Sequence, residues 1–333
     1  MKKILAAALA LLAGAATAEP MKLRVDYTSS PGQSAAVMSV VPKYGPGVYR
    51  HYGKSYVIDP LQMAGGGVVL TAITSGETDV SGFTPQMVVL GKDEVKLDFK
   101  IIGQQLSDGV PGNARTFWWV RKDEIQKISD LKGKTIAINA RGANPDAALR
   151  MTMNRNNMVD GKDYQIVEVR FPAMLPSLME KRVDAAILIP PFYLPAEKNP
   201  ALKPLFAVDD VFGPNETVMW AVRSDFLAKN RAVLVDFLED AMRYRRWIRD
   251  PKTRPDAMKA VAEITKQPPE ALAEWVNTEK DYYIDLNCMV NVERLQKNVN
   301  DMKNLGITKT SFDVTPLVDM SLVKEAMGRV GGS

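Results

Sequence analysis

The chain has 333 residues, 46% of them hydrophobic, and carries 43 Lys and Arg against 39 Asp and Glu. These charges are nearly balanced and scattered, which excludes the basic stripe that nucleic-acid binding requires. The single cysteine, Cys288, excludes an intramolecular disulfide, and the single histidine, His51, argues against most hydrolase and zinc mechanisms, which use His clusters or Cys pairs.

Residues 1–18 have the pattern of a secretory signal peptide. Lys2 and Lys3 precede an apolar run from Ile4 to Ala13, and small residues lie at Ala16 and Ala18. A retained membrane anchor is the alternative, but the run is shorter than the ~20 residues that a bilayer requires. We expect a mature protein that begins at Glu19 and works in the periplasm of a Gram-negative cell.

The first part of the mature chain alternates short strand patterns with helical ones. Strands are predicted at 22–27, 55–58 and 77–83. Helices are predicted after the turn at 28–32, over 68–75, and from Thr84-Pro85, where proline suits the first helical turn. This order predicts an α/β fold with a largely parallel sheet, which binds ligands beyond the carboxyl ends of its strands.

The alternation begins again in the middle of the chain, so we expect two lobes. Strands are predicted at 116–120, 135–139, 165–169, 183–189 and 217–222. The first and last of these are expected to pair as hinge strands, with Trp118, Trp119 and Trp220 packed there. Helices are predicted at 147–156, 173–181, 226–249, 257–265, 269–277 and 292–305. Lobe 1 would comprise 19–116 and 222–333, and lobe 2 would comprise 117–221.

Three segments resemble a known family. Residues 128–137 contain the sequence DLKGK, residues 72–80 read AITSGETDV, and residues 178–192 contain VDAA followed by PPF, with Lys181-Arg182 where a glycine is usual. Together they are similar to the periplasmic solute-binding proteins of ABC importers in the nitrate, taurine and alkanesulfonate group, which includes relatives that resemble thiamine-precursor binding proteins. The resemblance covers about residues 22 to 330.

The resemblance implies a two-lobed, type II-like periplasmic-binding-protein fold, each lobe a mixed, mostly parallel sheet flanked by helices. It places ligand contacts where strands end. In this sequence those positions are Ser29, Ser30, Gly82, Phe83, Thr84, Arg141, Gly142, Asn144, Phe171, Pro191 and Phe192. The segment Arg141-Gly142-Ala143-Asn144 departs from the serine-rich segment of sulfonate-binding members.

The chemistry of these positions favours an anionic ligand. Helix starts carry unpaired amide donors, and Arg141 offers a planar fork for a carboxylate or sulfonate. The alternative is that Arg141 is a solvated loop charge. Phe83, Phe171 and Phe192 favour an aromatic carboxylate if they line the pocket rather than the core. The glycines at 65–67 predict a turn or a close backbone approach.

The sequence therefore favours a monomeric binding protein, without cofactor, metal or catalysis, that closes on a small organic anion and delivers it to an ABC permease and its ATPase. A ligand sensor for a membrane receptor and an exported hydrolase are the alternatives. The ligand stays open among sulfonates, carboxylates, nitrate-like ions and a pyrimidine. The basic cluster at 243–246 is interpreted as a solvated helix face or a permease contact.

Overall fold

A computed structural model describes residues 19–28, 34–304 and 306–331. The predicted signal peptide at 1–18 and the predicted contacts Ser29 and Ser30 lie outside the described residues. Among the residues that are described, no helix has the length and apolar character needed to cross a bilayer.

The first lobe is built on five strands. β1 runs parallel to β2, and an isolated parallel bridge between Val25 and Val80 links β1 to the chain just before β3. β10 lies antiparallel between β3 and β4. The bounds are β1 (Met21–Tyr27), β2 (Tyr56–Gln62), β3 (Ser81–Phe83), β4 (Phe99–Asp108) and β10 (Asn215–Arg223).

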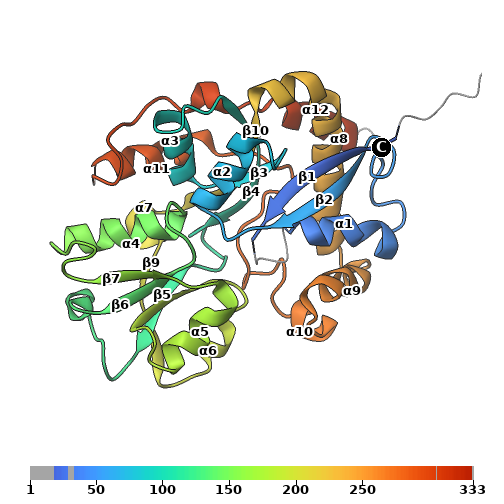
Figure 1. Ribbon diagram of the computed structural model, residues 1–333. Helices are drawn as coiled ribbons and strands as arrows, with labels where there is room; N and C mark the ends of the chain where they lie inside the picture. The colour runs from blue at the N-terminus through green and yellow to red at the C-terminus, as the bar shows by residue number, and fades with distance from the viewer. Residues whose placement is uncertain (1–18, 29–33, 305, 332–333) are drawn as a thin grey trace, which may run out of the picture.

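Helices surround these strands, and several begin with side-chain caps (Figure 1). Ser34 caps α1 by accepting from the Ala36 amide, and Thr84 caps α3 by accepting from the Met87 amide, with Pro85 in the first turn. The helices of this lobe are α1 (Ala35–Tyr44), α2 (Gly67–Ser75), α3 (Pro85–Asp93), α8 (Ser224–Arg249), α9 (Arg254–Thr265), α10 (Pro269–Ala273), α11 (Val292–Asn304) and α12 (Ser321–Gly331).

The second lobe holds a five-stranded mixed sheet in the order β7-β6-β8-β5-β9 (Figure 1). β6 is parallel to β7 and β8, whereas β5 is antiparallel to β8 and β9. The strands are β5 (Phe117–Arg121), β6 (Thr135–Ile138), β7 (Gln165–Glu168), β8 (Ala185–Leu188) and β9 (Leu202–Ala207), and the helices are α4 (Asn144–Arg155), α5 (Phe171–Met179), α6 (Leu194–Glu197) and α7 (Asp209–Phe212).

The α/β fold class with mixed sheets flanked by helices is confirmed, but the predicted pairing of the two tryptophan-bearing strands is wrong. β5 pairs inside the second lobe and β10 inside the first. Trp118 stacks on Phe206 at 4.6 Å, whereas Trp220 packs edge-on against Phe237. Each tryptophan therefore fills the core of its own lobe. The chain crosses between lobes through the segments that join β4 to β5 and α7 to β10. The lobe boundaries given above stay a prediction.

The interpretation of residues 243–246 as a solvated face is also wrong. Arg245 is buried and lies over the Trp220 ring at 5.1 Å, and it donates to the carbonyls of Gln104 and Asp285. Arg246 donates to the carbonyl of Leu286. These arginines hold the segment after α10 against the end of β4, so their charges stabilise the first lobe and are not spread over its surface.

Two buried clusters form the core. One runs from the five-stranded sheet through α4 and α5 to α2, α3 and α11, so it spans both lobes. The other fills the space between β1, β2 and α1 on one side and α8, α9 and α12 on the other.

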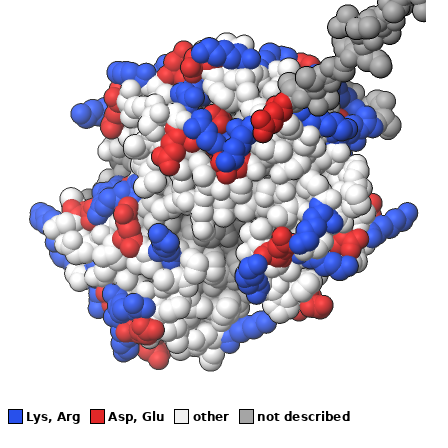
Figure 2. All heavy atoms as spheres, turned by 45° about the vertical axis from the view of Figure 1, so that its right-hand side comes forward, with Lys and Arg blue, Asp and Glu red and all other residues white. Residues whose placement is uncertain are grey.

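On the face shown in Figure 2, acidic and basic side chains are interspersed, as their scatter along the sequence predicts.

Candidate binding cleft

A cavity lies between the lobes. Residues from the ends of β1, β3 and β4 line one side, and residues that follow β6, β7 and β8 line the other. The lining residues are Asp26, Tyr27, Thr28, Ser34, Gly65, Gly66, Gly82, Thr84, Met87, Gln105, Leu106, Asp108, Thr116, Asn139, Ala143, Asn144, Pro145, Phe171, Ile189, Val208, Thr217, Val218 and Tyr282.

The lobes touch at the rim of this cavity. The Asn139 amide nitrogen donates to the Ala64 carbonyl at 3.1 Å, and the Gly67 amide donates to the Arg141 carbonyl at 3.3 Å. Gly66 has φ of +57°, and a Cβ there would lie 2.2 Å from the Arg141 carbonyl oxygen. Glycine is therefore required at 66 for this approach, which is the close backbone contact that the glycine run allowed. These contacts belong to a closed arrangement of the lobes.

Asp26 lies at the floor of the cavity. Its carboxylate accepts the Gly82 amide at 3.1 Å, which ties the end of β1 to β3. Burial raises the pKa of Asp26 to about 6, while hydrogen bonds from Ser81 and Gly82 oppose this rise. The amide nitrogen of Gln105 also lies beside Gly82 and has no hydrogen-bond partner among the described residues.

Asp108 ends β4 and is fully buried. Its Oδ1 accepts the amides of Gly109 at 2.8 Å and Thr116 at 3.1 Å, whereas its Oδ2 has no partner in the described part of the chain. Burial raises the pKa of Asp108 to about 7, and the nearby negative charge of Asp209 acts in the same direction, whereas hydrogen bonds from Thr116 and Gly109 oppose the rise. Asp108 Oδ2 is thus a carboxyl oxygen of a lining residue that accepts no hydrogen bond from the described residues.

The second lobe contributes neutral groups. Asn144 donates to the Asn215 side-chain oxygen at 2.9 Å, which leaves its own Oδ1 unpartnered within the described residues. The Oδ1 of Asn139 is also buried without a partner there. Phe171 adds an aromatic wall and stacks on Phe192, their centroids 6.5 Å apart.

The structure brings four of the predicted contact residues together: Gly82, Thr84, Asn144 and Phe171 line the cavity. Five others lie outside its lining. Phe83 is buried against Phe99, and Phe192 packs behind Phe171. The remaining three outside the lining are Arg141, Gly142 and Pro191.

Local carboxylates already bind the donors that were expected to hold an anion. The Arg141 guanidinium is half-exposed, pairs with Asp160 at 3.0 Å, and donates to the Ile166 carbonyl. The Arg141 amide donates to Glu168 and the Gly142 amide donates to Asp146. The donors of Arg141 and Gly142, which precede α4, are therefore paired with the protein's own acidic side chains.

Sequence reasoning missed Asp26, Gln105 and Asp108. Asp26 was assigned only to a strand, and residues 99–108 were not assigned to any element. A signal was present, because Gln104, Gln105, Ser107 and Asp108 follow the apolar Ile101-Ile102 and mark a strand that turns polar toward its carboxyl end.

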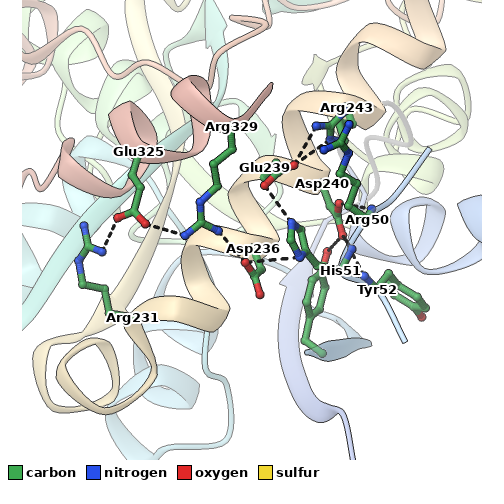
Figure 3. Close-up of polar contacts among 11 residues, drawn as sticks. Arg50, His51, Tyr52, Arg231, Asp236, Glu239, Asp240, Arg243, Glu325 and Arg329 are labelled. Carbon is green, nitrogen blue, oxygen red and sulfur yellow. Dashed lines mark hydrogen bonds and ion pairs between the residues drawn. The ribbon is translucent and has the colours of Figure 1, made fainter. Parts of the chain in front are cut away.

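His51 and Cys288 lie away from the cavity lining. The His51 ring contacts Glu239 at 2.8 Å and Asp236 at 3.5 Å, and the main chain at 50–52 donates to Asp240 on α8 (Figure 3). Cys288 is fully buried. Among the described residues, no three His, Cys, Asp or Glu side chains are grouped so as to hold a metal ion.

A second groove adjoins the cavity and shares Thr28, Asn139 and Phe171 with it. Arg170, which is exposed, is the charged residue of this groove. A cationic side chain is thus present near the mouth of the site but not in the described lining of the cavity itself.

Solved structures share this architecture at low sequence identity. The periplasmic aliphatic sulphonate binding protein SsuA from Escherichia coli has a TM-score of 0.63 at 17% identity, over 92% of this chain and 99% of that chain. The periplasmic nitrate-binding protein NrtA from Synechocystis PCC 6803 has a TM-score of 0.70 at 14% identity, over 95% and 90%.

A ligand binding component of an ABC-type import system from Staphylococcus aureus, solved with zinc bound, has a TM-score of 0.66 at 17% identity, over 92% of this chain and 99% of that chain. These likenesses establish the periplasmic-binding-protein fold. A comparison with curated proteins gave no match. The family model described as NMT1/THI5 like matches residues 58–248, more than half of the chain, and the chain therefore belongs to the NMT1/THI5-like family.

Proposed function

We propose that this protein is the substrate-binding component of an ABC importer. It captures a small organic molecule outside the cytoplasmic membrane, closes its two lobes around it, and delivers it to a membrane permease that a cytoplasmic ATPase powers. The observation that carries this proposal is the cavity between the lobes, which both lobes line and which the contacts of Asn139 and Gly67 close at its rim. The pattern of residues 1–18 supports export.

Binding without catalysis is the simplest role for this cavity. The histidine lies on the α8 side of the first lobe, and the cysteine thiol is buried with its pKa raised to about 11 by burial. The sequence favoured a small organic anion, an aromatic carboxylate or a sulfonate. The described lining holds two carboxyl groups and no Lys or Arg, so it does not support that choice.

The test is to purify the protein under mild conditions, extract it with methanol, and identify the released molecule by mass spectrometry. A variant with a filled cavity, Ala143→Phe, is the control, because Ala143 lines the cavity and caps α4 without a side-chain hydrogen bond. We expect about one small molecule per wild-type chain, none from the variant, and loss of uptake of that molecule when the gene is deleted. Equal recovery from both proteins, or unchanged uptake, would contradict the proposal.

A further inference from the structure

We infer that the ligand is a weak organic base, an amine or amidine with an apolar body, whose N–H groups donate to the unpartnered oxygens of Asp108, Asn139 and Asn144. This inference rests on the proposed function and names the ligand class of the same cavity. The inferred ligand carries a positive charge, whereas the sequence favoured an anion.

The orientation of Asn139 is set by its partner. Its amide nitrogen donates to the Ala64 carbonyl, which only accepts, so the side-chain oxygen is the atom left over. The contact that fixes this orientation also joins the two lobes, and Asn139 is a lining residue of the cavity.

The orientation of Asn144 is set through a second amide. Asn215 donates its nitrogen toward the carbonyls of Asp108 and Gly213, so its oxygen faces Asn144 and also accepts the Thr217 hydroxyl at 2.8 Å. Asn144 must then donate to that oxygen, and its own Oδ1 remains as an acceptor. With Asp108 Oδ2, the described residues of the lining hold three buried side-chain acceptors without a partner and one such side-chain donor, the Gln105 side-chain nitrogen.

The charges of the cavity favour the same class of ligand. Asp26 and Asp108 are its carboxyl groups, and the described lining contains no Lys, Arg or His. Buried charges require pairing, so an anion would add repulsion to a site that a cation completes. Met87, Leu106, Phe171 and Ile189 supply a surface for an apolar body.

Two of the described groups that act on Asp108 are Asp209 and Tyr282, and neither is basic. Asp209 on α7 faces it and is held by Arg115 at 2.8 Å, and Tyr282 lies close, with its hydroxyl bonded to Thr116 at 2.7 Å. Arg115 is therefore neutralised by Asp209, which leaves the Asp108 carboxyl for the ligand.

The experiment compares isosteric compounds by calorimetry at pH 7.5. Benzamidinium, benzamide and benzoate share one shape and differ in charge and in donors, and benzylammonium and benzenesulfonate extend the two charged classes. We expect the two cations to bind at least about tenfold more tightly than the two anions, and benzamide to lie between. Because a cation binds the ionised carboxyl, its affinity should rise from pH 5.5 to pH 7.5, and an anion that binds the protonated carboxyl would show the reverse.

Asp108→Asn is the decisive variant, because its side-chain oxygen keeps the bonds from Gly109 and Thr116 while an NH₂ donor replaces the unpartnered Oδ2. We expect at least about a tenfold loss of benzamidinium affinity. Asp281→Asn is the matched control: Asp281 is equally buried, accepts the amides of Asn277 and Tyr282, and does not line the cavity. The affinity of the Asp281→Asn protein for benzamidinium should change less than about twofold.

Tighter binding of benzoate or benzenesulfonate than of the cations, or an Asp108→Asn loss matched by Asp281→Asn, would overturn the inference. So would failure of both cations to bind while the extraction experiment recovers an anion, and in that case the proposed function would stand. Failure of all five compounds together with extraction of no molecule would refute both. The inference would also fail if the two cations do not bind and Arg170→Ala weakens the binding of benzoate or benzenesulfonate. Recognition would then be assigned to an anion held by Arg170 in the adjoining groove.

Discussion

The two walls of the cleft differ in chemistry. The first lobe presents carboxyl groups at the ends of β1 and β4, Asp26 and Asp108, each buried and held by backbone amides. The second lobe presents neutral side chains, Asn139, Asn144 and Phe171. The carboxyl groups lie on strands β1 and β4, whereas the neutral side chains lie in the segments after β6 and β7. We infer that the first lobe selects the charge of the ligand and that the second lobe shields it from water.

Gly66→Ala should have the largest effect, because it prevents the neutral wall from meeting the charged one. The added Cβ would lie 2.2 Å from the Arg141 carbonyl oxygen, and the residue has a positive φ that strains a side chain. We expect ligand affinity to fall by about a hundredfold, about 2.7 kcal/mol, and the radius of gyration measured by X-ray scattering to resist reduction by ligand. Gly67→Ala is the control, since a Cβ there meets nothing within 4 Å; equal behaviour of the two variants would contradict the prediction.

Phe171→Ala should weaken the neutral wall. The ring lines the cavity and is buried, so its removal costs about 3 kcal/mol of folding free energy and about tenfold in ligand affinity. Phe192→Ala removes the ring behind it and should lower stability with a smaller effect on affinity. Denaturant unfolding measures the loss of stability, and calorimetry measures the loss of ligand affinity. A larger loss of affinity in Phe192→Ala than in Phe171→Ala would contradict the prediction that the ligand contacts Phe171.

The charged wall should make stability depend on pH. Burial raises the pKa of Asp108 to about 7 from its ordinary value of 3.8, so the folded protein holds a proton that unfolding releases. This contribution is present below about pH 4 and is lost as pH rises through about 7. The melting temperature of Asp108→Asn minus that of wild type, without ligand, should therefore increase from pH 5 to pH 7.5. Contributions of Asp26 and Asp281 cancel in the difference, and a difference independent of pH would refute the assignment.

Arg141→Ala should have the smallest effect. Its side chain is half-exposed and pairs with Asp160, which also pairs with Arg150 at 3.0 Å. A pair of this kind contributes about 0 to 1 kcal/mol to stability. The sequence favoured a tenfold loss of anion affinity on this substitution, whereas the structure leads us to expect ligand affinity within about twofold of wild type. A tenfold loss would return Arg141 to the binding site.

Most of the secondary structure follows from local patterns. The predicted helices 68–75, 226–249 and 257–265 correspond to α2, α8 and α9, because apolar periodicity is a local property that the chain displays directly. β4 and β9 were not assigned, since neither is bounded by a strong turn signal on both sides. The pairing of β10 with β3 and β4 depends on contacts across more than a hundred residues, which spacing along the chain does not reveal.

Four of the predicted contact residues line the cavity, and the predicted anionic ligand stays a prediction. The ends of strands supplied Gly82, Thr84, Asn144 and Phe171, as a parallel arrangement predicts. Arg141 pairs with Asp160, which lies beyond α4 in the sequence and meets it only in the folded chain. The Gly82 amide is likewise already paired within the protein, because it donates to the Asp26 carboxylate. Which carboxylates satisfy the protein's own donors and which remain for a ligand is decided by tertiary contacts.

The most direct test is a crystal structure of the protein with the small molecule that it retains through purification. We predict that the molecule lies between the lobes with an N–H group within about 3.2 Å of both Asp108 Oδ2 and Asn144 Oδ1. A molecule bound by Arg141 or outside the cavity, or an anion facing Asp108, would contradict this account.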